Sequence, residues 1–403
     1  MLYDFNFYSS LLLITFSQGI IYSILLLKKA IQTNNKSNYW LSLFVFLCSL
    51  YVAPWMLGFA GWYDNQPYRN FMFYMPFQHL YFVGPILYFY IQSLLNPTFK
   101  SEKKHLLHFI PGILYLVYNL IIFVYDKLIA QKIYFYADGM DKDFDQWYQI
   151  SGQISMLFYF IICYKYYSNY KKLVVEITSN ANDLLFEWIK KYLIAFSIML
   201  FLPILFDLLG NFYPELKSYV GGWWFYLFYS LILFYIAITG YGNSAVTQIG
   251  FQFKYENDNL IYYLTEKNTP SIVYENIVDI HKTVIDDIET ENLLHWKSAI
   301  EQLIVKDNIY KNPEITLPDL AKKLKTNIAV VSKTINQGFG LNFNDFINNY
   351  RIEAVKEMFV KGEHKKSTLI GIAYDCGFNS KATFNRAFKK NMGLSPKDYL
   401  SQI

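Results

Sequence analysis

Seven long apolar stretches follow one another in roughly the first 240 residues of the chain. Each is about 20 residues long, the length that an α-helix needs to cross the hydrocarbon core of a bilayer. Several begin or end in Trp or Tyr, which favour the membrane interface. We therefore predict a membrane domain over residues 1–241. Its seven transmembrane helices are expected at residues 8–27, 39–60, 71–95, 105–125, 147–167, 189–210 and 219–241.

Basic residues are distributed unequally between the loops on the two sides of this domain. The loops on one side contain eleven lysines, whereas those on the other contain five Lys or Arg residues. Loops rich in Lys and Arg stay in the cytoplasm. We therefore expect a multi-pass protein of the cytoplasmic membrane, with its N-terminus outside and its C-terminus in the cytoplasm. The first stretch lacks the positive leader of a cleavable signal peptide, so we interpret it as a retained span.

Three polar side chains fall inside these apolar stretches. Gln78 and His79 lie in the third stretch and Asp207 lies in the sixth. Such groups usually face a bundle interior or a water-filled cavity, because burying them in lipid is costly. One interpretation is a pocket for an unknown small-molecule or membrane signal. The other is that Gln78 and His79 bond neighbouring helices and that Asp207 is shallow enough to be hydrated.

Hydrophobicity falls in a segment that separates the membrane domain from the C-terminal part. From residue 243 to 313 the chain has 6 Lys and Arg against 11 Asp and Glu, so we assign residues 242–313 to an acidic cytoplasmic linker. Apolar residues at helical spacing in 274–294 predict an amphipathic helix. It would serve in signalling or in forming a homodimer, or would pack on its own domain. A second helix is predicted at 293–306.

The last part of the chain, residues 314–403, is basic, with 14 Lys and Arg against 8 Asp and Glu, as expected for a protein that binds a polyanion. It begins with a short helix at 317–325 that has one apolar face. Asn327 can cap a second helix at 328–336, because its side chain can accept from free backbone amides. The outer face of that second helix presents Ala329, Ser332 and Lys333.

A similar pair of helices follows. The first contains Ile372 and ends in the turn 376–378, and Ser380 can cap the second, at 381–391. The second helix of a helix-turn-helix enters the major groove of DNA. Arg and Asn can recognise guanine and adenine there, while lysines contact phosphates. The predicted base contacts of the second helix are Lys381, Ala382, Asn385 and Arg386, and the predicted phosphate contacts are Lys389 and Lys390.

Residues 315–402 resemble the AraC/XylS-type DNA-binding domain in several stretches. These are LPDLAKKL, KTIN, the joint GLNFNDFINNYRI, IAYDCGF and FNRAFKKNMGLSPKDY. The resemblance implies seven helices, two helix-turn-helix units and one double-stranded promoter site, bent or straight, per protomer. RNA polymerase is a candidate further partner. It implies the same base-contacting positions as the helix faces do. The first reading helix departs from the pattern because it has few hydrogen-bonding groups. The whole chain resembles membrane-anchored members of this family.

The overall prediction is an all-α protein, a seven-transmembrane bundle followed by a cytoplasmic all-helical domain. We expect a one-component transcription regulator that is not an enzyme and has no cofactor or metal. The three cysteines are far apart and form no CxxC pair. The alternatives are a transporter or intramembrane enzyme with a DNA-binding tail, and a bundle that only anchors the chain. The enzyme alternative lacks support because the spans contain no HExxH or GxSxG motif.

Overall fold

The computed structural model describes residues 3–97, 99–100, 102–135, 145–181, 187–243, 250–256, 259–265, 272–274 and 290–402. The chain divides into two compact units. The first unit comprises residues 1–167 and 187–248, and the second comprises residues 168–186 and 249–403. Residues 168–186 belong to the second unit although they lie between two predicted spans.

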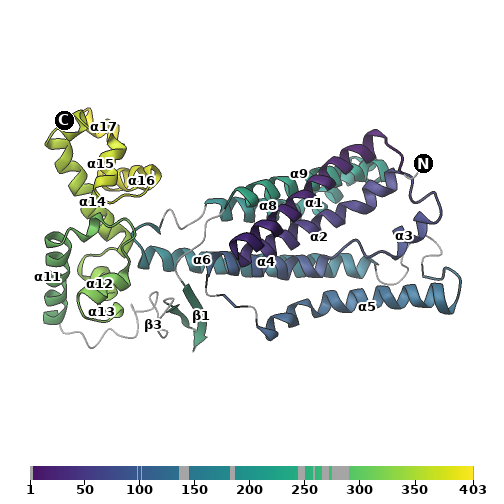
Figure 1. Cartoon of the computed structure of the whole chain (residues 1–403), viewed down its shortest axis with the longest axis horizontal. Helices are drawn as coiled ribbons and strands as arrows, with labels where there is room; N and C mark the ends of the chain where they lie inside the picture. The colour runs from purple at the N-terminus through teal and green to yellow at the C-terminus, as the bar shows by residue number, and fades with distance from the viewer. Residues whose placement is uncertain are drawn as a thin grey trace. The chain divides into compact units, whose positions relative to one another are not determined.

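The first unit is a bundle of long helices (Figure 1). Asn6 and Asn35 cap the first two of these helices by accepting from backbone amides of the first turn. The elements are α1 (Phe7–Thr33), α2 (Lys36–Phe59), α3 (Tyr68–Tyr74), α4 (Leu80–Leu95), the 3-10 helix η1 (Lys103–Phe109), α5 (Ile110–Val124), the π-turn η2 (Tyr125–Ile129), α6 (Asp145–Ile177, whose last ten residues belong to the second unit), α8 (Glu187–Phe212), η3 (Pro214–Lys217) and α9 (Tyr219–Gly242).

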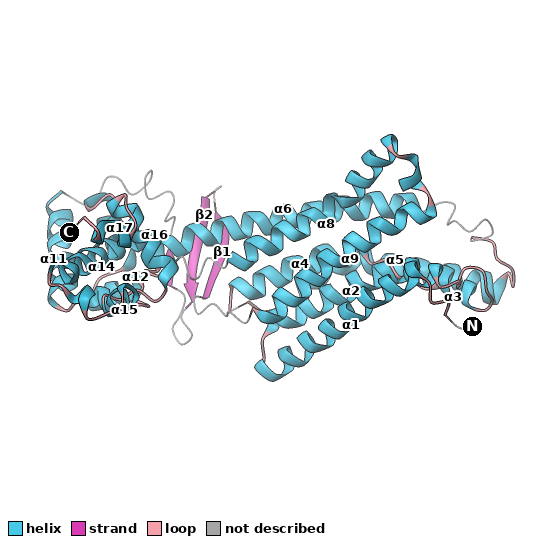
Figure 2. Ribbon diagram, turned by 90° about the horizontal axis from the view of Figure 1, so that it is seen from above, coloured by secondary structure: helices cyan, strands magenta, loops and turns pink. Residues whose placement is uncertain are grey.

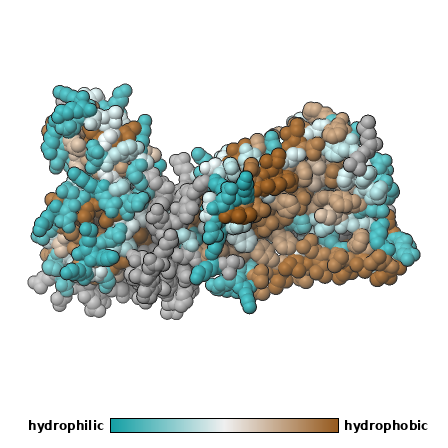
Figure 3. All heavy atoms as spheres, in the orientation of Figure 1, coloured by the Kyte–Doolittle hydropathy of each residue, from teal (hydrophilic) through white to brown (hydrophobic). Residues whose placement is uncertain are grey.

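Five helical stretches among the described residues are long and apolar enough to cross a bilayer. They are Phe7–Thr33, Lys36–Phe59, Lys103–Ile129, Trp188–Phe212 and Tyr219–Gly242. Helix α4 is shorter, with 16 residues, and α6 is not among the five although it has 33 residues. Exposed leucine and isoleucine side chains line α5, and Figure 3 shows the first unit largely covered by hydrophobic side chains. An apolar surface of this extent is typical of contact with lipid.

The third predicted span, 71–95, is not one helix. Helix α3 ends at Tyr74, residues 75–79 are not helical, and α4 begins at Leu80. Pro76 explains the break, because proline lacks an amide hydrogen and disfavours the helical conformation of the residue before it. Met75 accordingly has an extended backbone, with φ −81° and ψ 121°. Gln78 and His79 therefore lie in an irregular segment and not within a transmembrane helix.

Small residues allow the helices of the first unit to pack closely. A β-carbon on Gly19 of α1 would lie 2.1 Å from Oγ of Ser49 on α2. Further along the same interface, Oγ of Ser23 donates to the carbonyl of Ser42 at 3.0 Å, and Oγ of Ser42 donates to the carbonyl of Ser23 at 2.7 Å. Close backbone approach and interhelical hydrogen bonds of this kind are typical of membrane helix pairs.

The second unit contains a short sheet that the all-α prediction missed. Strands β1 (Gly250–Glu256), β2 (Asn259–Thr265) and β3 (Ile272–Tyr274) pair antiparallel in the order β1-β2-β3 and are drawn in magenta in Figure 2. The sequence of β1, GFQFKYE, alternates apolar and polar residues, which is the strand period. Most of the predicted amphipathic helix 274–294 lies outside the described residues. Its first residue ends β3, and residues 290–294 begin the next helix.

The rest of the second unit is helical, as predicted. Its core joins the middle of α14 to α15 and α16 through Val355, Ile372, Phe384 and Phe388, which are at most 1% exposed. The elements are α11 (Thr290–Lys306), η4 (Ile309–Lys311), α12 (Leu317–Lys323), α13 (Ile328–Lys333), the π-turn η5 (Thr334–Gly338), α14 (Phe343–Val360), η6 (Glu363–Lys365), α15 (Leu369–Asp375), α16 (Lys381–Met392) and α17 (Pro396–Leu400).

Candidate nucleic-acid interface

The first candidate reading helix, α13, is joined to α12 by a tight turn. The chain reverses at Lys325, which has a positive φ of 54°, and the amide of Thr326 donates to the carbonyl of Ala321 at 3.1 Å. The side chain of Asn327 then accepts from the amide of Val330 at 2.8 Å and starts α13. The predicted cap is therefore present.

The turn between α15 and α16 has the same geometry: a residue with positive φ is followed by an amide that donates to the carbonyl five residues earlier. Gly377 has φ +94°, and the amide of Phe378 donates to the carbonyl of Ala373 at 3.0 Å. Ser380 caps α16 by accepting from the amide of Thr383 at 3.1 Å. A β-carbon on Gly377 would lie 2.4 Å from the carbonyl oxygen of Tyr310, so both the backbone conformation and the space require glycine there.

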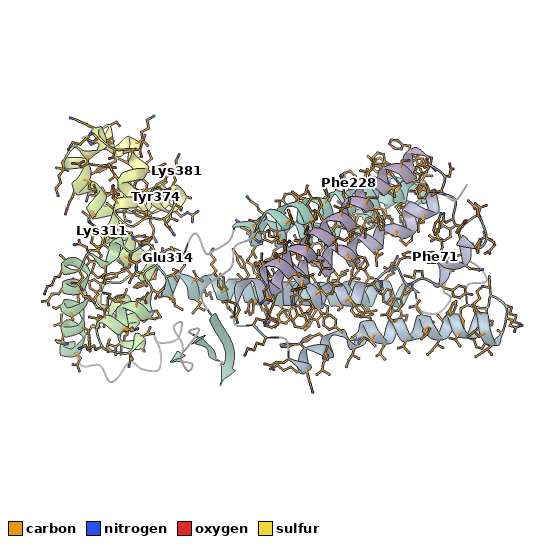
Figure 4. The ribbon with its side chains drawn as sticks, viewed as in Figure 1. Phe71, Phe228, Lys311, Glu314, Tyr374 and Lys381 are labelled. Atoms are coloured by element: carbon orange, nitrogen blue, oxygen red, sulfur yellow. The ribbon has the colours of Figure 1, made fainter. Side chains whose placement is uncertain are left out.

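The outer face of α16 is exposed as the sequence predicted. Phe384 and Phe388 are buried on the inner side, and Lys381, labelled in Figure 4, begins the helix on the outside. The other exposed residues of the predicted contact set are Ala382, Asn385, Arg386, Lys389 and Lys390. This surface combines amide, guanidinium and ammonium groups, which suit base edges and phosphates.

Lys390 is paired with a carboxylate and is therefore less available than Lys389 for contact with a DNA phosphate. Its Nζ lies 2.6 Å from Oδ2 of Asp345, a residue of the first turn of α14. The predicted phosphate contact at this position therefore competes with an ion pair.

The outer face of α13 differs from that of α16. Ala329 is exposed, but Ser332 is only 3% exposed and Lys333 only 5% exposed. The amide of Asn336, one turn further on, donates to Oγ of Ser332 and to a carboxylate oxygen of Glu176, both at 3.5 Å. In the structure, Ser332 and Lys333 are thus not open to a ligand.

A buried arginine joins several segments of the second unit. The guanidinium of Arg351 on α14 is fully buried and donates to the carbonyls of Tyr310 and Asn312, both at 2.8 Å. It also donates to Oγ of Ser179 at 2.9 Å. These acceptors offset the cost of removing the charge from water. Sequence reasoning missed this contact because Arg351 and Ser179 are 172 positions apart.

Comparison with known proteins identifies this part of the chain. A family described as a helix-turn-helix domain matches residues 320–402, and this range holds α13, α14 and the whole second helix pair. Residues 320–402 form an AraC-type helix-turn-helix domain.

The relatives of this AraC-type domain are regulators by name. An uncharacterized HTH-type transcriptional regulator of Staphylococcus aureus (strain COL) is 23% identical over 192 residues, covering 39% of this chain and 25% of the relative. The HTH-type transcriptional activator RhaS of Mannheimia succiniciproducens is 26% identical over 85 residues, covering 21% of this chain and 31% of the relative. An uncharacterized HTH-type transcriptional regulator, YtdP, of Bacillus subtilis (strain 168) is 21% identical over 178 residues, covering 42% of this chain and 22% of the relative. The chain spans about a quarter of the length of the first of these relatives. No solved structure matches.

The AraC-type domain contains one buried thiol, that of Cys376 at the end of α15. Its side chain is 1% exposed, and burial raises the pKa of the thiol to about 11. Among the described residues of the whole chain, no group of three or more His, Cys, Asp or Glu side chains could hold a metal ion.

The three polar residues predicted to form a pocket in the first unit are not brought together. His79 lines a cavity between helices with Tyr51, Gln153 and Tyr229. Gln78 instead accepts a hydrogen bond from the side-chain amide of Gln149. Asp207 is largely exposed, and its carboxylate lies 3.7 Å from Nζ of Lys217. Of the three, His79 is the residue on the cavity wall.

Proposed function

We propose that the chain is a membrane-embedded transcription regulator whose AraC-type domain binds double-stranded promoter DNA in the cytoplasm. In this proposal α13 and α16 are the reading helices of two helix-turn-helix units. Base edges would be contacted by the outer faces of both helices, and phosphates by Lys389 and Lys390 at the end of α16.

The observation on which the proposal depends is the exposed outer face of α16. Asn385 and Arg386 stand one turn from Lys381 and Ala382, on the side opposite the buried Phe384. Residues near the N-terminus of a reading helix are those that meet base edges. A helix that only completes a hydrophobic core would not need this set of donors at those positions.

The apolar helices of the first unit support attachment to the cytoplasmic membrane. The cavity lined by His79 and three further polar side chains supports a sensing role for this bundle, because an apolar pocket with a few polar groups is the usual form of a small-molecule site. A signal would act by binding one arrangement of the bundle more tightly than another. Formation of a homodimer and contact with RNA polymerase remain predictions.

The test uses the full chain reconstituted in lipid nanodiscs and sheared genomic DNA of the source organism. We expect discrete fragments to be retained at low salt and released as salt rises, because phosphate contacts release counterions. Empty nanodiscs of the same lipids are the control. Retention of no fragment even at low salt, by the wild type and by the released variants described below, would refute the proposal.

A further inference from the structure

The two reading helices provide an internal comparison. Each begins at a capping side chain, and in each case the fourth and eighth residues after that cap are buried. They are Val331 in α13 with Ile335 in the following η5, and Phe384 and Phe388 in α16. The fifth and sixth residues after the cap must therefore point outward in both helices. In α16 these are Asn385 and Arg386, which are exposed, whereas their counterparts in α13 are buried. Something covers the outer face of α13 that does not cover α16.

A contact beside this face comes from the end of α6. Glu176, one residue before the last of that helix, contacts Asn336, which in turn contacts Ser332 on the covered face. Residues 168–181 belong to the same compact unit as the AraC-type domain. Most apolar residues of this segment are buried; they include Leu173, Val174 and Ile177, each at most 1% exposed.

Hydrogen bonds hold the segment against the start of α12 and the first turn of α14. Thr178 forms an antiparallel bridge with Thr316, and the amide of Ser179 donates to the carbonyl of Ile315 at 3.2 Å, just before α12 begins. On the other side, the side-chain amide of Asn344 donates to the carbonyls of Thr178 and Ser179 at 3.2 and 2.9 Å. The segment is held by specific bonds from two elements of the domain.

We propose that residues 168–181 are an autoinhibitory segment that occupies the DNA-reading face of α13 and must leave it before α13 can enter a major groove. The inference rests on the proposed function, since it assumes that α13 reads DNA. DNA and the segment compete for one surface, and therefore the apparent affinity for DNA is lowered by the fraction of molecules in which the face is free.

The position of the segment in the sequence explains how a membrane signal reaches it. It follows directly on the part of α6 that belongs to the first unit, and α8, which begins at Glu187, returns the chain to that unit. A change in either helix moves the segment through covalent bonds, without passing along the acidic linker. A ligand that favours the arrangement with a free α13 would thereby favour DNA binding.

The first experiment locks the closed state reversibly. In the full chain in nanodiscs, E176C together with N336C places thiols at two positions whose native side chains contact each other, and mass spectrometry confirms the disulfide, while the native Cys48, Cys163 and Cys376 are buried and react slowly. The probe is a fluorescein-labelled mixed-sequence 40-base-pair duplex at low salt. We expect oxidation to weaken binding at least about tenfold and reductant to restore it. Each single-cysteine variant, oxidised in parallel, is the control.

The second experiment opens the contact. N344A removes two hydrogen bonds to the segment, and we expect it to tighten binding of the same duplex about three- to tenfold. E176A should act in the same direction. The matched control is E353A, which removes the same charge from the exposed side of α14, where Glu353 pairs with Lys356 at 2.8 Å. Because a negative charge is lost, we expect E353A to tighten binding of the duplex by at most about twofold.

The outcomes separate this inference from the proposed function. Equal affinity of the oxidised and reduced double-cysteine protein, with N344A like wild type, would mean that the segment is a fixed part of the fold and would overturn the inference alone. Failure of every variant to bind duplex DNA would overturn the proposed function itself. Reversal of the oxidised effect by reductant excludes misfolding as its cause.

Discussion

Lys390 on α16 and Asp345 on α14 form an ion pair, with Nζ of the lysine 2.6 Å from Oδ2 of the aspartate. The aspartate side chain is only 20% exposed, so the pair is partly shielded from solvent. Lys389, the neighbouring lysine, is exposed on the same helix. The two lysines were assigned the same role from the sequence, and the structure distinguishes them.

Lys389→Ala should therefore reduce the salt dependence of DNA binding more than Lys390→Ala does. Removing one phosphate contact lowers the slope of log K against log salt by about one. Lys390 must break its ion pair with Asp345 before it can contact a phosphate. Lys390→Ala should therefore lower the slope by clearly less than Lys389→Ala does. The measurement is duplex affinity of the full chain over a series of salt concentrations. Equal slopes for the two variants would show that the ion pair opens freely when DNA binds.

Arg386→Ala should weaken binding to the cognate site by about 1–3 kcal/mol and relax the base preference at one position, as expected for loss of a guanine contact. Lys397→Ala on α17 removes the same charge from an exposed site outside the reading face and is the matched control. Selection of bound duplexes from a randomised pool, sequenced for both variants, measures the preference. An unchanged preference with Arg386→Ala would remove α16 from the role of principal reader.

Gly377→Ala should destabilise the second helix pair by more than about 2 kcal/mol, because the cost of a left-handed residue, about 1–2 kcal/mol, adds to a clash. The clash is with the carbonyl oxygen of Tyr310. Gly393→Ala is the control, since Gly393 also has a positive φ of 73° but has no neighbour within 4 Å of the added carbon. Amide hydrogen exchange of α15 and α16 in the full chain measures the loss of stability in each of the two variants. Similar protection in the two variants would mean that Tyr310 moves away at little cost.

Much of the AraC-type domain could be predicted from sequence, because its signals are local. The capping role of Ser380 depends on residues within three positions, and the register of α16 follows from the spacing of Phe384 and Phe388. The same holds for Asn327 and α13. Exposure of the α16 face followed from these local rules alone.

Other features depend on contacts that have no local signal. The burial of Lys333 could not be predicted, since the segment near it lies more than 150 positions earlier in the chain. The break between α3 and α4 had a signal in Pro76, but proline is also tolerated inside helices, as Pro54 in α2 shows. The strand β1 had a period of two that was obscured by its position in an acidic, polar linker.

Cys376 should resist alkylation in the folded protein at neutral pH. With the pKa raised to about 11, roughly three thiols in ten thousand are ionised at pH 7.5, and the thiolate is the reactive form. Mass spectrometry after brief treatment with iodoacetamide should find this residue unlabelled, and labelling should increase as the pH is raised toward 11. Unfolding in detergent and urea is the control that makes the thiol reactive. Rapid labelling at pH 7.5 would show that α15 opens readily.

The number of membrane crossings can be decided at two loops. With seven crossings, Lys104 is cytoplasmic and Lys132 is outside. If only the five long apolar helices cross, the positive-inside rule still places the C-terminus in the cytoplasm, but Lys104 is outside and Lys132 is cytoplasmic. Residues 168–186 are cytoplasmic in both arrangements, as binding to the AraC-type domain requires.

We expect seven crossings. Residues 96–104 and 126–145 contain three lysines each, but five aspartates offset the lysines of 126–145. Single cysteines at 104, 132 and 180 in a chain whose three native cysteines are replaced, treated in intact cells with an impermeant maleimide, provide the measurement. Labelling at 132 alone is the expected result, and labelling at 104 alone would establish five crossings. Labelling at 180 would place the segment on the wrong side of the membrane and would contradict its role in covering α13.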